Sequence, residues 1–164
     1  MLSYLHAFHA GNFADVHKHA ALVLALRMMQ AKPAAIACFD THAGSAIYDL
    51  TSTKALKTAE AASGVYKIWS CREQLSTEDW QALLTGMAAG TNKDERLISY
   101  PGSPRWFSHY LRDQDLLVAF ELHPVEGEAL AKWASGLARV RVFQGDGLKG
   151  LLRHLPPRQP RLLV

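Results

Sequence analysis

The sequence predicts an α/β fold in which helices cover a parallel sheet. Three observations lead to this prediction: an unbroken apolar run at residues 34–40, a helix-like segment directly before it, and strand-like and helix-like segments that alternate from residue 103 onward. Strands that are buried on both faces are apolar throughout, and such strands belong to parallel sheets whose connections are helices.

Residues 12–32 are predicted to form the first helix. Either Asn12 or Asp15 can cap its first turn, and Pro33 ends it because proline disrupts a helix interior. Its apolar positions recur at helical spacing and fall on one side of the helix: Val16, Ala20, Val23, Leu24 and Met28. The apolar run at 34–40 then follows as the first buried strand.

Residues 50–98 are predicted to be a helical insertion, because no strand-like run separates the helix-like stretches at 51–70 and 76–90. Ser76 and Asp79 resemble a capping box, with aspartate in place of the usual glutamate. We therefore expect three parts: residues 1–49 with the first helix and strand, the insertion at 50–98, and residues 99–164, in which the α/β core continues.

The alternation of elements resumes after the insertion. Helices are expected at 103–114, 124–137 and 148–155, and strands at 115–123, 139–147 and 160–164. Helices of this length between strands are typical of crossover connections in a parallel sheet.

Composition limits the class of protein. The 164 residues suit one domain with a core, and a net charge of +3 permits a polyanionic partner without requiring one. The chain has no apolar run of about 18 residues, and its first residues lack the pattern of a secretory signal. Cys38 and Cys71 do not have metal-site spacing, and we expect Cys38 to be a small buried residue. The sequence thus predicts a cytoplasmic protein without a membrane span.

Acidic residues lie at or just past the ends of three predicted strands: Asp40, Glu121 and Asp146. Ligands of open parallel sheets bind outside the carboxyl ends of the strands. A carboxylate there can accept hydrogen bonds from ribose hydroxyls, and a second one can accept a bond from the amine of a base. The alternative is that these acids lie at strand ends only because those ends face water. Glycines near two of the acids favour a nucleoside ligand, although "HAGSA" is not a dinucleotide-binding motif.

Histidines cluster near the amino terminus at His6, His9, His17 and His19. Residues two apart on a helix point in different directions, and no cysteine or carboxylate group completes a ligand shell, so we predict no metal site. His42 lies in the turn after the first strand, where its ring can contact a ligand directly.

The sequence resembles a known family in five motifs that occur in order: "MLSYLHAFHAGNFADVHKHAALV", "DTHAG", "YPGSP", "ELHP" and "GDG". These motifs are similar to those of the bacterial 23S ribosomal RNA adenine-N6 methyltransferases of the RlmJ type, and the similarity covers essentially the whole chain. The resemblance implies a Rossmann-like S-adenosylmethionine-dependent methyltransferase fold with an inserted helical subdomain. It also implies S-adenosylmethionine as cofactor and an adenine of 23S rRNA as substrate.

The resemblance also implies roles for individual residues. It places His19, His42 and Ser103 near the methionine end of the cofactor, Glu121 at the ribose, and Asp146 and Gly147 near the adenine. It assigns Tyr4 and Lys18 to the RNA side. For Phe8, RNA contact and packing of the first helix remain equally open.

The family's Asp-Pro-Pro-Tyr motif, which holds the target adenine, is absent from this sequence. The resemblance places it after Val164, so we expect a truncated sheet, the cofactor-binding half of the enzyme and no catalytic residue in this chain. The edge formed by residues 161–164 would then be exposed and able to self-associate. Two other functions stay open: a non-catalytic RNA- or nucleotide-binding module, and an NAD-type oxidoreductase, which the altered glycine loop disfavours.

Overall fold

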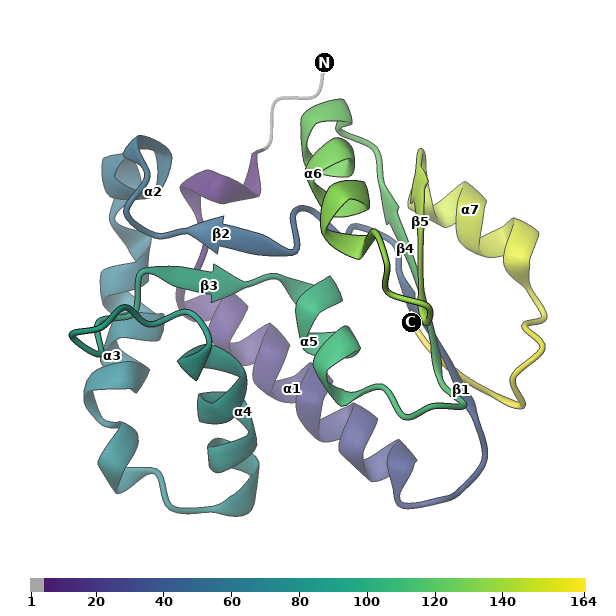
Figure 1. Ribbon diagram of the computed structural model, residues 1–164, viewed down its shortest axis with the longest axis horizontal. Coiled ribbons are helices and arrows are strands. Elements are labelled where there is room, and N and C mark those ends of the chain that lie inside the picture. Colours follow the sequence, from purple (N-terminus) through teal and green to yellow (C-terminus); the bar gives the residue numbers. More distant parts are fainter. Residues whose placement is uncertain (1–4) are drawn as a thin grey trace. The chain divides into compact units, whose positions relative to one another are not determined.

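The structure is a computed structural model that describes residues 5–164. It confirms the α/β class and the Rossmann-like arrangement, with a parallel sheet of four strands in the order β5-β4-β1-β6 (Figure 1). These strands are β1 (Ile36–Asp40), β4 (Leu116–Glu121), β5 (Val140–Gln144) and β6 (Arg161–Leu163).

The chain divides into two compact units, which we describe separately. The first comprises Met1–Leu24 and Ile47–Pro101, and the second comprises Ala25–Ala46 and Gly102–Val164. Helix α1 (Phe13–Gln30) runs through both. Its amino terminus follows the prediction, because the Asn12 side chain accepts a hydrogen bond from the Asp15 amide at 2.9 Å.

The second unit contains the four-stranded sheet. Helices α5 (Ser103–Tyr110) and α6 (Pro124–Ala134) lie on one side of it and α7 (Gly147–His154) lies on the other (Figure 1). The apolar cluster on the α7 side consists of Ala37, Phe39, Val118 and Phe120, against which Leu116 and Leu151 pack. Because all pairings are parallel, the carboxyl ends of the strands lie at one end of the sheet.

An ion pair between the buried Asp115 and the partly exposed Arg112 fixes the opposite end of the same sheet. The Asp115 carboxylate accepts hydrogen bonds from the Arg112 side chain, from the Gln30 side chain and from the backbone amide of Ile36. The Arg112 guanidinium in turn donates to three carbonyl groups between residues 30 and 34. These contacts hold the starts of β1 and β4 side by side, with Ala37 opposite Leu116.

The first unit is mainly helical. It contains α2 (Thr53–Thr58), α3 (Val65–Ser70), α4 (Glu78–Ala88) and the 3-10 turns η1 (His6–Phe8), η2 (Glu60–Ser63) and η3 (Arg72–Gln74). Strand β2 (Ile47–Asp49) precedes these three α-helices in the sequence and β3 (Ser99–Pro101) follows them. The two strands pair in a small antiparallel sheet. The sequence did not predict this small sheet.

Two local predictions in this unit are wrong. The stretch 51–70 is not one helix, because the backbone turns at Ala59, which has a left-handed φ of 53°. Helix α4 begins at Glu78 after Thr77, so Ser76 and Asp79 do not form a capping box. Among residues 5–164, no helix is long and apolar enough to cross a membrane.

Candidate functional site

The loop after β1, residues 41–46, which we call the β1 loop, is fixed to the neighbouring strand and helix by three successive residues. The Ala43 amide donates to the Phe120 carbonyl at 3.0 Å, and the Gly44 amide donates to Oε2 of Glu121 at 2.6 Å. The Ser45 hydroxyl donates to Oε2 of Glu126 in the first turn of α6. Gly44 has a φ of +60°, which residues with a side chain rarely adopt, so glycine suits this turn.

Glu121 ends β4 and lies at the centre of these contacts. Its Oε1 accepts the His123 amide at 2.7 Å while its Oε2 accepts the Gly44 amide. A carboxylate has about four acceptor positions, so two backbone donors leave it able to accept hydroxyl groups of a ligand. Its backbone carbonyl also accepts the Gly145 amide at 2.8 Å, which joins the ends of β4 and β5.

The start of α7 adjoins the β1 loop directly. A Cβ on Gly147 would lie 1.9 Å from the Thr41 carbonyl oxygen, so only glycine allows this close approach. Asp146 caps α7, since its Oδ1 accepts the Lys149 amide at 3.0 Å. This hydrogen bond holds the pKa of the Asp146 carboxyl below its usual value.

The remaining predicted residues of the second unit belong to the same end of the sheet. His42 is exposed, and its Nδ1 lies 2.9 Å from the Thr41 hydroxyl. Ser103 is the first residue of α5, and the preceding Gly102 amide donates to the Ala46 carbonyl at 2.9 Å. The structure therefore brings five of the predicted cofactor residues to one sheet end: His42, Ser103, Glu121, Asp146 and Gly147.

His19 and Lys18 lie in the first unit, which is described by itself. His19 is 1% exposed, and its Nδ1 lies 2.9 Å from the Tyr100 hydroxyl. Burial lowers the pKa of His19 to about 3, so the ring is neutral at physiological pH. Tyr4, predicted to contact RNA, lies outside the described residues.

Asp15 organises the charged groups around Lys18. Its carboxylate lies 2.8 Å from Nε2 of His6 and 3.0 Å from Nζ of Lys18, and it accepts the Gly11 amide at 2.9 Å. Burial alone would raise the pKa of Asp15, but the hydrogen bond and charge of His6 outweigh it and hold that pKa far below its usual value. The half-exposed Lys18 is thereby held at a fixed position on α1.

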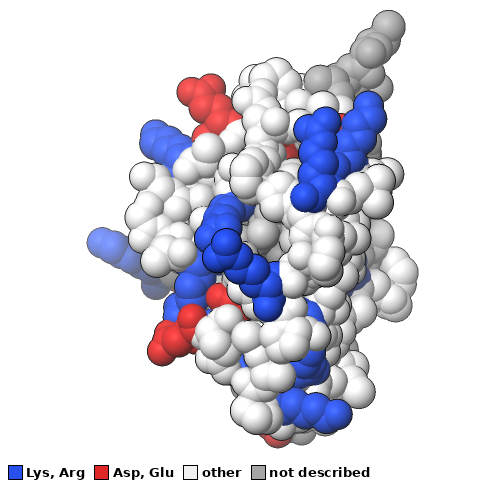
Figure 2. Space-filling view, turned by 90° about the vertical axis from the view of Figure 1, so that its right-hand side faces the viewer, with Lys and Arg blue, Asp and Glu red and all other residues white. Residues whose placement is uncertain are grey.

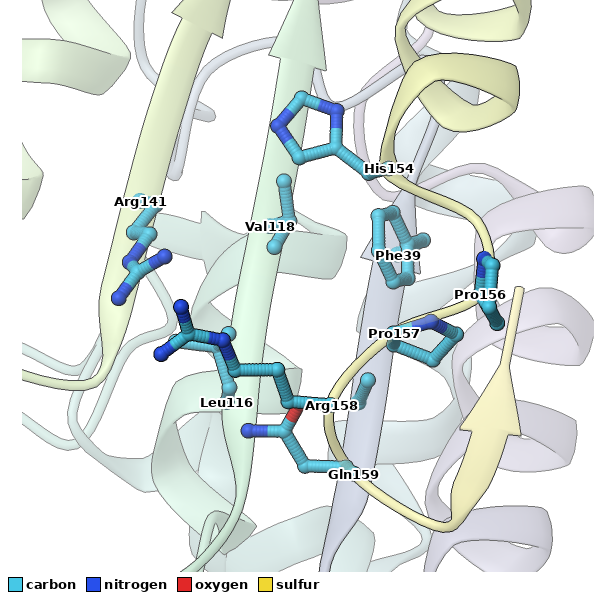
Figure 3. A pocket seen from close by; sticks show the side chains of 10 residues that line it. Phe39, Leu116, Val118, Arg141, His154, Pro156, Pro157, Arg158 and Gln159 are labelled. Carbon is cyan, nitrogen blue, oxygen red and sulfur yellow. The ribbon is translucent and has the colours of Figure 1, made fainter.

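A cavity of about 500 Å³ in the second unit lies elsewhere (Figure 3). Its apolar lining comes from β1, β4 and the prolines at 156–157, and the guanidinium groups of Arg141 and Arg158 point toward each other at its edge. The cavity contains none of the predicted cofactor residues. Within residues 5–164, no group of three or more His, Cys, Asp or Glu side chains is placed to hold a metal ion.

Sequence reasoning did not identify Ser45 or Glu126 as parts of the site. Glu126 is the third residue of α6, where a glutamate normally indicates only a helix amino terminus. The contact between the two side chains joins residues 81 positions apart. No local pattern reports a pairing at that separation.

A family model described as "Ribosomal RNA large subunit methyltransferase D, RlmJ" matches residues 33–164. Two curated proteins called ribosomal RNA large subunit methyltransferase J are similar over the whole chain. The one from Escherichia coli is 38% identical and the one from Haemophilus influenzae is 36% identical.

The chain spans 58% of the length of each of these two relatives. A crystal structure of a Legionella pneumophila protein of the DUF519 family superposes with a TM-score of 0.82 at 35% identity, over 92% of this chain and 54% of that one. The match over most of the sequence and the shared fold lead to one conclusion. The chain belongs to the RlmJ family of ribosomal RNA large subunit methyltransferases.

Proposed function

We propose that this chain forms the S-adenosylmethionine-binding part of a methyltransferase that modifies the exocyclic N6 of an adenine in 23S rRNA. Membership in the RlmJ family supports the reaction class. The observation that carries the cofactor assignment is the Glu121 carboxylate at the end of β4, which also holds the glycine turn of the adjacent β1 loop.

The residues at this sheet end fit an adenosyl cofactor. Glu121 would accept hydrogen bonds from the ribose hydroxyls, and Asp146 with Gly147 would lie near the adenine. His42 and Ser103 would contact the methionine end. The roles of His19 and Lys18 stay predictions that rest on the family resemblance.

S-adenosylmethionine supplies an electrophilic methyl group on a sulfonium sulfur. The residues of this chain bind and orient it, and orientation of the reacting groups is a large part of such catalysis. The Asp-Pro-Pro-Tyr motif that would position the target amine is absent from these 164 residues. We therefore expect the chain alone to bind the cofactor without methylating RNA.

The RNA side of the proposal rests on Tyr4 and Lys18 and on a basic surface. Residues 139–164 contain a single acid, Asp146, and six bases: Arg139, Arg141, Lys149, Arg153, Arg158 and Arg161. Lys and Arg side chains are spread over the face shown in Figure 2. Such a surface attracts a polyanion, which agrees with a ribosomal RNA substrate in the cytoplasm.

Isothermal titration calorimetry with S-adenosylhomocysteine tests the cofactor assignment. We expect the chain to bind it weakly and Glu121→Ala to weaken binding further. Glu128→Ala is the matched control, because Glu128 is an exposed acid on α6. Equal affinities of the wild type and the Glu121 variant would remove Glu121 from the site.

The basic segment also keeps the second candidate function open, a non-catalytic RNA- or nucleotide-binding module. The two candidates differ in one measurement, because an RNA-binding module should not respond to S-adenosylhomocysteine.

We also propose that β6, which lies at an edge of the sheet with Leu162 and Val164 exposed, allows self-association. Sedimentation that gives a monomer at high concentration would contradict this.

A further inference from the structure

We propose that Glu126 is a positioning residue that holds Ser45 and thereby preorganises the β1 loop for the cofactor. This inference rests on the proposed cofactor function of that sheet end. Glu126 is 9% exposed, and the hydrogen-bond partner of its carboxylate is the Ser45 hydroxyl. A carboxylate this buried is costly to keep unless hydrogen bonds compensate it, so its contact with the loop needs an explanation.

Helix capping does not provide that explanation. A glutamate at the third helical position normally reaches back to the amide of the cap residue, which here is His123. That amide already donates to Oε1 of Glu121 at 2.7 Å. The Glu126 side chain instead crosses to the β1 loop, although it begins one turn from a cap position.

The two carboxylates have different tasks in this arrangement. Glu121 holds the Gly44 amide and is also the proposed ribose ligand, so a bound cofactor shares its oxygens with the loop. Glu126 is not a proposed cofactor ligand, and its carboxylate accepts the hydroxyl of the next loop residue, Ser45. The Ser45 contact can therefore keep the loop in place while the ligand engages Glu121.

The β1 loop is also hydrogen-bonded on either side of Ser45. Ala43 is bonded to the Phe120 carbonyl, and Ala46 accepts the Gly102 amide at the start of α5, next to Ser103. Ser45 lies between these two points, so releasing its side chain loosens the segment that joins His42 to Ser103. A loop that is already ordered loses less entropy when ligand binds, which strengthens binding without any direct contact.

The test is a double-mutant cycle on the full 164-residue chain, with S-adenosylhomocysteine as the titrated ligand in calorimetry. We expect Ser45→Ala and Glu126→Ala each to raise the dissociation constant about tenfold, the size expected for a hydrogen bond to a charged group. The double variant should bind no more weakly than either single variant, because both changes remove the same contact.

Two further variants separate positioning from general loss of structure. Glu126→Gln keeps an acceptor oxygen for Ser45, so we expect it to recover most of the affinity that Glu126→Ala loses. Glu128→Ala, an exposed acid two residues along α6, should bind like the wild type. Thermal unfolding without ligand identifies any variant that fails to fold, and Ser45→Ala then carries the test because it removes only a hydroxyl.

The outcomes distinguish this inference from the proposed function. If the wild type does not bind the ligand, the proposed function fails. The positioning role of Glu126 is overturned, while the proposed function stands, if both alanine variants bind the ligand as tightly as the wild type does. It is also overturned if the dissociation constant of the double variant rises by the product of the two single increases. A Glu126→Gln variant as weak as Glu126→Ala would also overturn it.

Discussion

Asp115 fixes the end of the sheet opposite the proposed site, and its replacement should strongly destabilise the second unit. The Asp115 side chain is fully buried and pairs with Nε of Arg112 at 2.9 Å. It also accepts the Ile36 amide at 2.9 Å and the Gln30 side chain at 3.1 Å. We predict that Asp115→Ala unfolds at a markedly lower urea concentration than the wild type.

The expected loss follows from these contacts. Arg112 is a quarter exposed and keeps three carbonyl partners, so the loss comes mainly from the hydrogen bonds to the charged Asp115 carboxylate, about 1.5–3 kcal/mol each. The Ile36 amide would also lose its acceptor, so we expect about 4 kcal/mol or more, against a total stability of about 5–15 kcal/mol. Asp115→Asn keeps one acceptor oxygen and should lose about half as much.

Urea unfolding followed by circular dichroism measures the loss, with the m-value as a check that unfolding stays two-state. Asp113→Ala is the matched control, because Asp113 is fully exposed and solvent screens its ion pair with Arg139. If both variants lose the same small amount, Asp115 does not anchor the sheet.

The same experiment has a pH dependence of known sign. Burial alone would raise the pKa of Asp115, but its hydrogen bonds to Arg112 and to the backbone outweigh this and hold the pKa below its usual value. A lowered native pKa gives stability that is fully present above the unfolded pKa, about 3.9, and is lost as the pH falls through the native value. The difference between wild type and Asp115→Ala should therefore shrink only below about pH 4.

Three other predictions follow from single contacts. Gly147→Ala places a Cβ 1.9 Å from a carbonyl oxygen of the β1 loop and should weaken S-adenosylhomocysteine binding in calorimetry, whereas Gly127→Ala, whose Cβ has ordinary contacts, should not. Burial raises the pKa of the Cys38 thiol to about 12, so native protein treated with iodoacetamide at pH 8 should be alkylated at the exposed Cys71 alone, and mass spectrometry that finds both modified would be contrary evidence. The pKa of buried His19 is lowered to about 3, so below about pH 6.5 the unfolded chain binds a proton at this residue and the native chain does not. The free energy of unfolding should therefore fall by up to about 1.4 kcal/mol per pH unit. Urea midpoints at pH 7.5 and pH 5 should show this loss in the wild type and less of it in His19→Gln, and equal losses would contradict it.

The sheet was predictable from sequence because its strands carry a strong local signal. The segment at Ile36–Asp40 is apolar at every position up to its final acid, and all five residues are buried. Helices α5, α6 and α7 begin within one residue of their predicted starts, since proline at the first turn or an aspartate cap marks each of them.

The small sheet of the first unit was not predictable in the same way. Strands β2 and β3 have three residues each and pair across about fifty intervening positions, too short for periodicity to report. The turn at Ala59 was also hidden, because alanine favours helix and the left-handed backbone is usually marked by glycine.

The residues of the proposed site also fall into two groups, those that a local sequence signal identifies and those that depend on tertiary packing. Glu121 and Asp146 were identified because an acid after a buried strand is a local signal with a physical meaning at the end of a parallel sheet. Ser45 and Glu126 were not, because their contact depends on the packing of α6 against the β1 loop. Local sequence therefore located the acids at the strand ends and left out the contact between Ser45 and Glu126.

The central claim is that the loops after β1, β4 and β5 form one binding site for an adenosyl cofactor. A ¹⁵N-resolved NMR titration with S-adenosylhomocysteine tests it most directly. We predict that the amide signals of Gly44, His123 and Gly147 shift together with one dissociation constant, while Gln159 beside the separate cavity does not shift. Shifts confined to the cavity, or different dissociation constants for the three amides, would contradict the claim.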